Sequence, residues 1–168
     1  MIFVLWKLTS GSDEVTFEPG VKAPESPIQQ TIKQAKSFKF KDHQITPLAD
    51  FKLQAKVLAK ENYHLGQASE LSPLDLALGW GKMSDQKVID QIDFSQSGRW
   101  YRRSIKAFPI PLREIETQSA NMHMVPSEYW IVNKLDSVKK GQVVALKGFL
   151  VRVDAEDSQW HWQSSLTC

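Results

Sequence analysis

Lys140-Gly-Gln-Val-Val-Ala-Leu-Lys-Gly-Phe-Leu-Val-Arg-Val153 is the stretch of sequence that decides the fold. Its β-branched and other apolar residues favour a strand, and Gly148 interrupts this pattern near its middle. A glycine inside a strand pattern usually marks a bulge, a barrel corner or a close approach of two backbones. The stretch therefore predicts a strand that bends, and a sheet that is curved and partly closed.

Two other segments show strand character. In residues 51–57, apolar side chains alternate with Lys52, Gln54 and Lys56, which is the pattern of a strand with one buried and one solvated face. Residues 94–105 also read as extended, with Gly98 at a turn or bulge.

Three or four short helices are expected between these strands. Ser72 would cap the first of them, with Pro73 at the first helical position and Asp75 near the positive end of the helix dipole. The others are expected at residues 84–92, 112–118 and 127–138. Strands and short helices that do not alternate regularly predict an α+β fold, with a strongly curved, barrel-like mixed or antiparallel sheet.

The 168 residues are enough for one domain with its own core, which we place at residues 27–168. Residues 1–26 are expected to form an apolar stub and an extended linker, because prolines, glycines and acids follow the first few residues without an apolar period. The last strand-like residues stop at Cys168, so we expect that a natural C-terminal strand is lacking. As the single cysteine, Cys168 cannot form an intrachain disulfide.

The charge is nearly balanced. A formal net charge of +2 gives little long-range field, so neither nucleic acid nor an acidic membrane surface is required as a partner. The apolar run at residues 1–7 is far shorter than the roughly 20 residues that span a bilayer. It is either the end of a longer anchor or signal, through which the protein would associate with a membrane, or a first strand or frayed terminus.

One group of polar residues suggests catalysis. In Asn121-Met-His123-Met124, strand alternation sends the two thioethers to one face and the imidazole to the other, and the four histidines lack metal-ligand spacing. We therefore predict no metal and no cofactor. His123, with Asn121 and a nearby acid or serine such as Ser119, is the candidate centre of a hydrolase or nuclease. A histidine satisfied by hydrogen bonds is the alternative.

Two aromatic segments suggest binding. Glycines flank Trp80, so its indole is either part of a recognition loop or a plug beneath the sheet. Arg99, Trp100, Tyr101 and Arg102 combine guanidinium groups with aromatic rings, as in single-strand nucleic-acid sites. The patch is short and isolated, so a solvated strand face is the simpler interpretation and a nucleic-acid partner is disfavoured.

Several motifs together resemble a family of uncharacterised bacterial proteins. They are Leu71-Ser-Pro-Leu-Asp-Leu-Ala-Leu-Gly-Trp-Gly-Lys-Met-Ser-Asp85, Ser95-Gln-Ser-Gly-Arg-Trp-Tyr101, Ser119-Ala-Asn-Met-His-Met-Val-Pro126 and Trp160-His-Trp-Gln-Ser-Ser-Leu-Thr167. The resemblance implies a small domain behind an N-terminal membrane anchor or signal, and it implies no activity. We therefore expect a non-enzymatic accessory or binding module at the bacterial cell envelope, membrane-anchored or periplasmic, with a hydrolase or nuclease, and a cytoplasmic location, as the alternatives.

Overall fold

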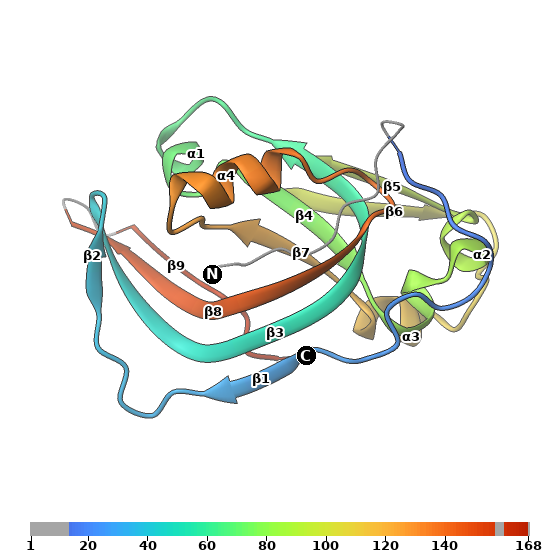
Figure 1. Cartoon of the computed structure of the whole chain (residues 1–168), viewed down its shortest axis with the longest axis horizontal. Coiled ribbons are helices and arrows are strands. Elements are labelled where there is room, and N and C mark those ends of the chain that lie inside the picture. The colour runs from blue at the N-terminus through green and yellow to red at the C-terminus, as the bar shows by residue number, and fades with distance from the viewer. Residues whose placement is uncertain (1–13, 157–159, 168) are drawn as a thin grey trace.

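The computed structural model describes residues 14–156 and 160–167. Its main sheet is organised around β3 (His43–Asn62), which pairs with β8 (Val143–Ala155) over most of the length of both strands. The strand order is β7-β4-β3-β8-β9, and every pair is antiparallel. Figure 1 shows β3 and β8 curving together through a U, so the sheet forms a half-barrel.

Two short strands complete the sheet. β1 (Ile28–Thr31) and β2 (Phe38–Phe40) pair with the first half of β3, on the side that β4 occupies further along. The predicted α+β class and strongly curved sheet are confirmed.

The strand pairing in the curved sheet is irregular at two places, and both lie on β3. The register shifts between Pro47 and Ala49 opposite β8, and between Val57 and Ala59 opposite β4. Gly148, the predicted corner, pairs with Phe51 in an unbroken register. The predicted bending strand is therefore present, and bulges on its long partner accompany the curvature.

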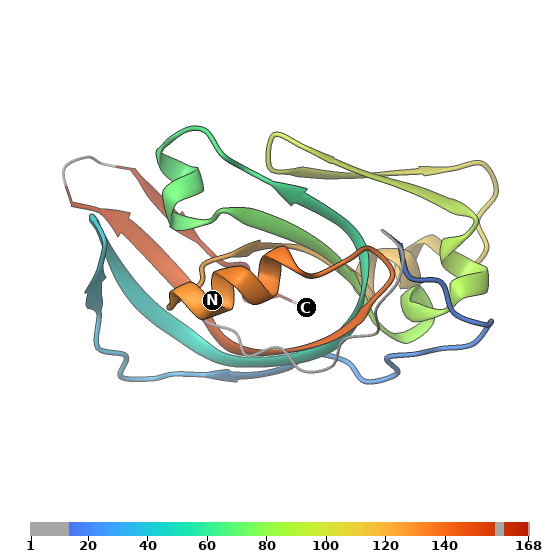
Figure 2. The same ribbon diagram turned by 45° about the horizontal axis from the view of Figure 1, so that its top comes forward.

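The concave face of the sheet holds the main core. Alternate residues of β3 face α4 (Tyr129–Asp136), whose Ile131 and Leu135 are buried against them. Figure 2 shows α4 lying within the curl of β3 and β8. The helix expected at residues 127–138 is thus confirmed, with its apolar stripe turned inward.

The convex face is also covered over β3 and β4. The elements that cover it are η1 (Gly81–Ser84), α2 (Gln86–Ile89), α3 (Leu112–Thr117) and the hairpin of β5 (Ile92–Ser97) and β6 (Trp100–Ile105). The extended segment expected at residues 94–105 and the helix at 112–118 are confirmed. The helix expected at residues 84–92 is shorter, because Asp85 caps it and Ile92 already belongs to β5.

The helix expected from Ser72 is wrong. Its residues form β4 (Leu74–Gly79), and the helix α1 (Gln67–Leu71) comes just before them. β4 lies between β3 and β7 and has both faces covered, so all of its residues are buried. Pairing and burial on two sides outweigh the local Ser-Pro capping signal.

The described part of the predicted linker is extended and bound to the domain. Phe17 N donates to Gln86 Oε1 at 3.0 Å, Gly20 N donates to Asp85 Oδ1 at 2.8 Å, and Ala23 N donates to Ser84 Oγ at 2.9 Å. We call residues 14–23 the strap. The apolar residues 1–7 and Cys168 lie outside the described residues.

Candidate functional site

The two ends of the curled sheet approach each other. β7 (Ser119–Met124) is last in the strand order at one end, and β9 (His161–Gln163) is last at the other. The ring of His123 on β7 lies edge-on to the ring of Trp162 on β9, with centroids 5.5 Å apart. We call the gap between β7 and residues 160–167 the seam.

Two cavities lie along the seam, one on each side of the contact between His123 and Trp162. The first has a volume of about 200 Å³, runs beside residues 119–123 of β7, and has a mostly apolar lining that includes Phe51, Trp80 and Leu150. The second has a volume of about 180 Å³ and lies beside α1, with Leu71, Val125 and Trp160 in its lining. His123 and Trp162 line both cavities.

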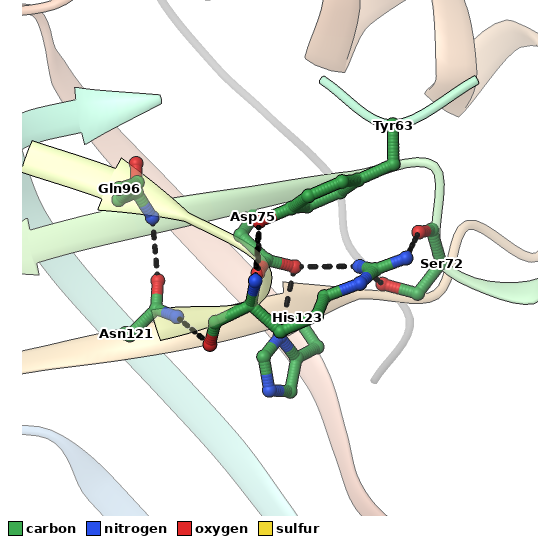
Figure 3. A network of polar contacts seen from close by, with 7 residues as sticks. Tyr63, Ser72, Asp75, Gln96, Asn121 and His123 are labelled. Atoms are coloured by element: carbon green, nitrogen blue, oxygen red, sulfur yellow. Dashed lines mark hydrogen bonds and ion pairs between the residues drawn. The ribbon is translucent and has the colours of Figure 1, made fainter. Parts of the chain in front are cut away.

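A buried carboxylate stands behind His123. Asp75 of β4 is opposite His123 in the register, and its side chain is completely buried. Its Oδ1 atom lies 2.8 Å from His123 Nδ1 and accepts a hydrogen bond from Arg99 Nη1 at 2.9 Å. Its Oδ2 atom accepts from the Tyr63 hydroxyl at 3.2 Å (Figure 3). A buried charge of this kind is tolerated because it is paired and hydrogen-bonded.

Arg99 reaches Asp75 from the tip of the β5–β6 hairpin. Gly98 and Arg99 both have positive φ, at 57° and 72°, and join paired residues Ser97 and Trp100, as in a type I′ turn. The guanidinium lies 3.8 Å from the centre of the Tyr63 ring. Its Nη2 also donates to the Ser72 carbonyl at 2.7 Å. These contacts hold a non-glycine residue in a conformation that it seldom adopts.

Asn121 fastens the same hairpin to β7. Its Oδ1 accepts from Gln96 Nε2 at 2.6 Å, and its Nδ2 donates to the Arg99 carbonyl at 3.4 Å (Figure 3). The predicted site residues Asn121, His123 and Arg99 therefore belong to one polar network, which links β4, β7 and the hairpin.

The geometry limits what His123 can do chemically. His123 Nδ1 lies 2.8 Å from Asp75 Oδ1, but the two atoms do not meet the geometry of a hydrogen bond, so this contact alone does not orient the imidazole as a base. His123 is 26% exposed, and Figure 3 shows its second ring nitrogen on the side away from Asp75. Ser119 lies four residues along the same strand, about 13 Å away, and its hydroxyl donates to the Ile115 carbonyl at 2.7 Å. Ser119 is therefore not positioned as a nucleophile for His123.

The predicted binding residues are divided among three environments. Trp80 is buried in the concave core, as in the plug interpretation, and reaches the seam only as part of the cavity lining. Tyr101 stacks on Phe94 within the convex core, where burial raises the pKa of its hydroxyl. Trp100, which is 70% exposed, and Arg102, also exposed, project into solvent.

Sequence reasoning missed Asp75 and Tyr63 as site residues. The capping signal at Ser72 predicts Asp75 as a helix-dipole acid, whereas its position as the one acid in the apolar run 74–79 is the signal that points to a buried role. Trp162 packs beside the third apolar cluster and also lines the seam.

No group of acidic, histidine or cysteine side chains in the described parts of the chain could hold a metal ion. Over the same residues, no helix is long and apolar enough to cross a membrane. Comparisons with family models, with curated proteins and with solved structures give no match to this chain. The resemblance to an uncharacterised bacterial family therefore stays a prediction.

Proposed function

We propose that the protein is a non-enzymatic binding module whose ligand site is the seam. The observation that carries this proposal is the cavity of about 200 Å³ beside β7, whose lining surface is mostly apolar and includes the polar side chains of Asn121 and His123. Ligand sites commonly combine an apolar concave lining with a few convergent polar groups. In this lining Asn121 is held by a hydrogen bond from Gln96 and His123 lies against Asp75, so both would meet a ligand in a preset geometry.

The ligand would present an apolar group to the seam. Trp80, Phe51 and Leu150 supply apolar surface in the cavity lining, and burial of apolar surface contributes roughly 25 cal/mol per Å². The polar network behind His123 would orient the ligand. In this proposal Trp100 and Arg102 are ordinary surface residues.

Hydrolase activity is the second candidate function. It is favoured by the 2.8 Å approach of the Asp75 carboxylate to His123, which puts an acid beside an imidazole, although the two atoms do not form a hydrogen bond. In this reaction class His123 Nε2 would take a proton from water, since Ser119 is engaged with α3. A location at the bacterial cell envelope remains part of the proposal and depends on the sequence resemblance alone.

A fluorescent apolar probe tests the binding proposal. The full chain is titrated with 1-anilinonaphthalene-8-sulfonate, and binding is compared with that of Ala120→Trp, which places an indole in the cavity beside β7. Trp100→Ala is the matched control, because it removes an exposed aromatic outside the cavity lining. We expect Ala120→Trp to reduce affinity at least tenfold and Trp100→Ala to leave it unchanged. Equal binding by all three proteins would contradict the proposal.

A different variant tests the second candidate function. A generic aryl ester is supplied to wild-type protein and to His123→Gln, with circular dichroism as the check on folding. Ester hydrolysis that disappears in His123→Gln would favour the hydrolase over the binding module.

A further inference from the structure

Among the residues that the structure describes, no strand pairs with the outer edge of β7. Trp80 N donates to the Gln118 carbonyl at 2.9 Å, and hydrogen-bonded pairs alternate along an antiparallel ladder. Residues 120, 122 and 124 therefore direct their backbone groups toward β4, and residues 119, 121 and 123 direct theirs toward the seam. In the described part of the chain, the backbone N–H and C=O groups of residues 119, 121 and 123 have no hydrogen-bond partner.

β9 repeats this arrangement across the seam. Ser164 N donates to the Val151 carbonyl at 2.9 Å, so the pairs of Ser164 with Val151 and of Trp162 with Val153 are hydrogen-bonded. The backbone of Gln163 accordingly faces the seam. Both borders of the cavity thus present main-chain donors and acceptors.

β7 lacks the features that usually protect a sheet edge. Its sequence, Ser-Ala-Asn-Met-His-Met, contains no lysine and no proline, and its register with β4 is regular along the whole strand. Natural edges are commonly blunted by charge, proline or a bulge, since an open edge is a template for another strand. This edge borders an apolar cavity instead.

The side chains of β7 define what could pair with it. Ala120 and Met122 pack against the concave core, and Asn121 and His123 face the convex polar network. A strand added beside β7 would therefore carry apolar side chains at the positions beside Ala120 and Met122 and polar ones between them. The described residues that line the cavity include no lysine or arginine, and their one carboxylate, Glu116, already lies 4.0 Å from Arg103 Nη2, so uncharged polar side chains fit this lining.

We infer that the seam binds an extended, uncharged polypeptide segment of alternating apolar and polar residues, which adds as a strand to the edge of β7. This inference rests on the proposed function and names its ligand class. The main-chain groups of residues 119, 121 and 123 supply the hydrogen bonds, and the cavity takes the apolar side chains, which is the general mode of strand addition.

Amide hydrogen exchange of the full chain tests the inference. The ligand is a capped peptide, Thr-Val-Ser-Val-Thr-Val-Ser, added to ¹⁵N-labelled protein. We expect exchange of the amides of residues 119, 121 and 123 to slow at least tenfold, while that of the already paired residues 120 and 122 changes less. The matched control peptide is N-methylated at its Thr and Ser residues, which removes the N–H groups that would face β7, and it should give no protection.

The outcomes distinguish this inference from the proposed function. If neither peptide protects β7 but the fluorescent probe binds the wild-type protein and binds Ala120→Trp more weakly, the seam is a ligand site and strand addition is wrong. Equal protection by both peptides would also overturn strand addition. If neither the probe nor the peptide binds, both proposals fail.

Discussion

Replacement of Asp75 by Asn should weaken the fold more than a change of one charge usually does. Asparagine keeps the shape of the side chain and one acceptor oxygen, but it removes the negative charge that faces Arg99 and His123. The carboxylate is completely buried, whereas the Arg99 side chain is 26% exposed and can regain some hydration. The substitution therefore isolates the electrostatic part of the network.

The size of the effect follows from these contacts. A hydrogen bond to a charged group contributes about 1.5–3 kcal/mol, and breaking a fully buried pair costs about 3–5 kcal/mol. Because Arg99 is partly exposed and can regain hydration, the effect of Asp75→Asn should lie nearer the range for a charged hydrogen bond than the range for a fully buried pair. We therefore expect a loss of about 2–3 kcal/mol in the free energy of unfolding.

Urea denaturation at neutral pH measures this loss. Asp93→Asn is the matched control, since Asp93 lies exposed on β5, and its effect should stay within about 0.5 kcal/mol. A double-mutant cycle that combines Asp75→Asn with Arg99→Met should give a coupling free energy of at least about 1 kcal/mol, because Arg99 donates a hydrogen bond to Asp75. An Asp75→Asn protein as stable as Asp93→Asn would refute the network as a structural element.

Three further predictions concern other parts of the molecule. Burial lowers the pKa of Lys56 to about 8, so between pH 8 and 10.5 the amine is neutral in the folded chain and charged in the unfolded one. As pH rises through this window, the free energy of unfolding of the wild type should therefore increase by about 1–3 kcal/mol relative to that of Lys56→Met. A difference in free energy of unfolding that stays constant with pH in urea denaturation would contradict this prediction. Gly141→Ala should lower the free energy of unfolding by about 1–3 kcal/mol, because φ is +82° and a Cβ atom would lie 1.7 Å from the Val15 carbonyl oxygen. The substitution should also expose the strap to proteolysis. An unchanged rate of cleavage would argue against this contact. Trp100→Ala should change stability by less than about 0.5 kcal/mol, and a larger loss in thermal melts would mean that the indole is packed.

Local pattern was enough to predict the curved sheet. Two signals needed only adjacent residues to be read: the alternation at residues 51–57 and the apolar stretch around Gly148. Both segments are strands in the structure. The Ser72 capping signal failed because a cap contributes about 1 kcal/mol, whereas a fully buried leucine contributes about 1.5–3 kcal/mol. β4 buries three leucines, at positions 74, 76 and 78.

The site could be predicted only in part, for a related reason. Strand alternation was enough to place Asn121 and His123 on one face of β7. The partner of His123 depends on which strand lies beside β7 and in what register, and neither is written in the local sequence. The seam likewise follows from the curl of the whole sheet, so no single segment could reveal it.

The most direct test of the seam as a ligand site is methyl NMR of protein labelled at its methionines. Met122 lines the cavity beside β7, whereas Met83 is fully buried in the convex core and serves as an internal control. On addition of the alternating peptide or the fluorescent probe, we predict that the Met122 methyl signal shifts and the Met83 signal stays in place. A saturable shift at Met83 with none at Met122 would contradict the account.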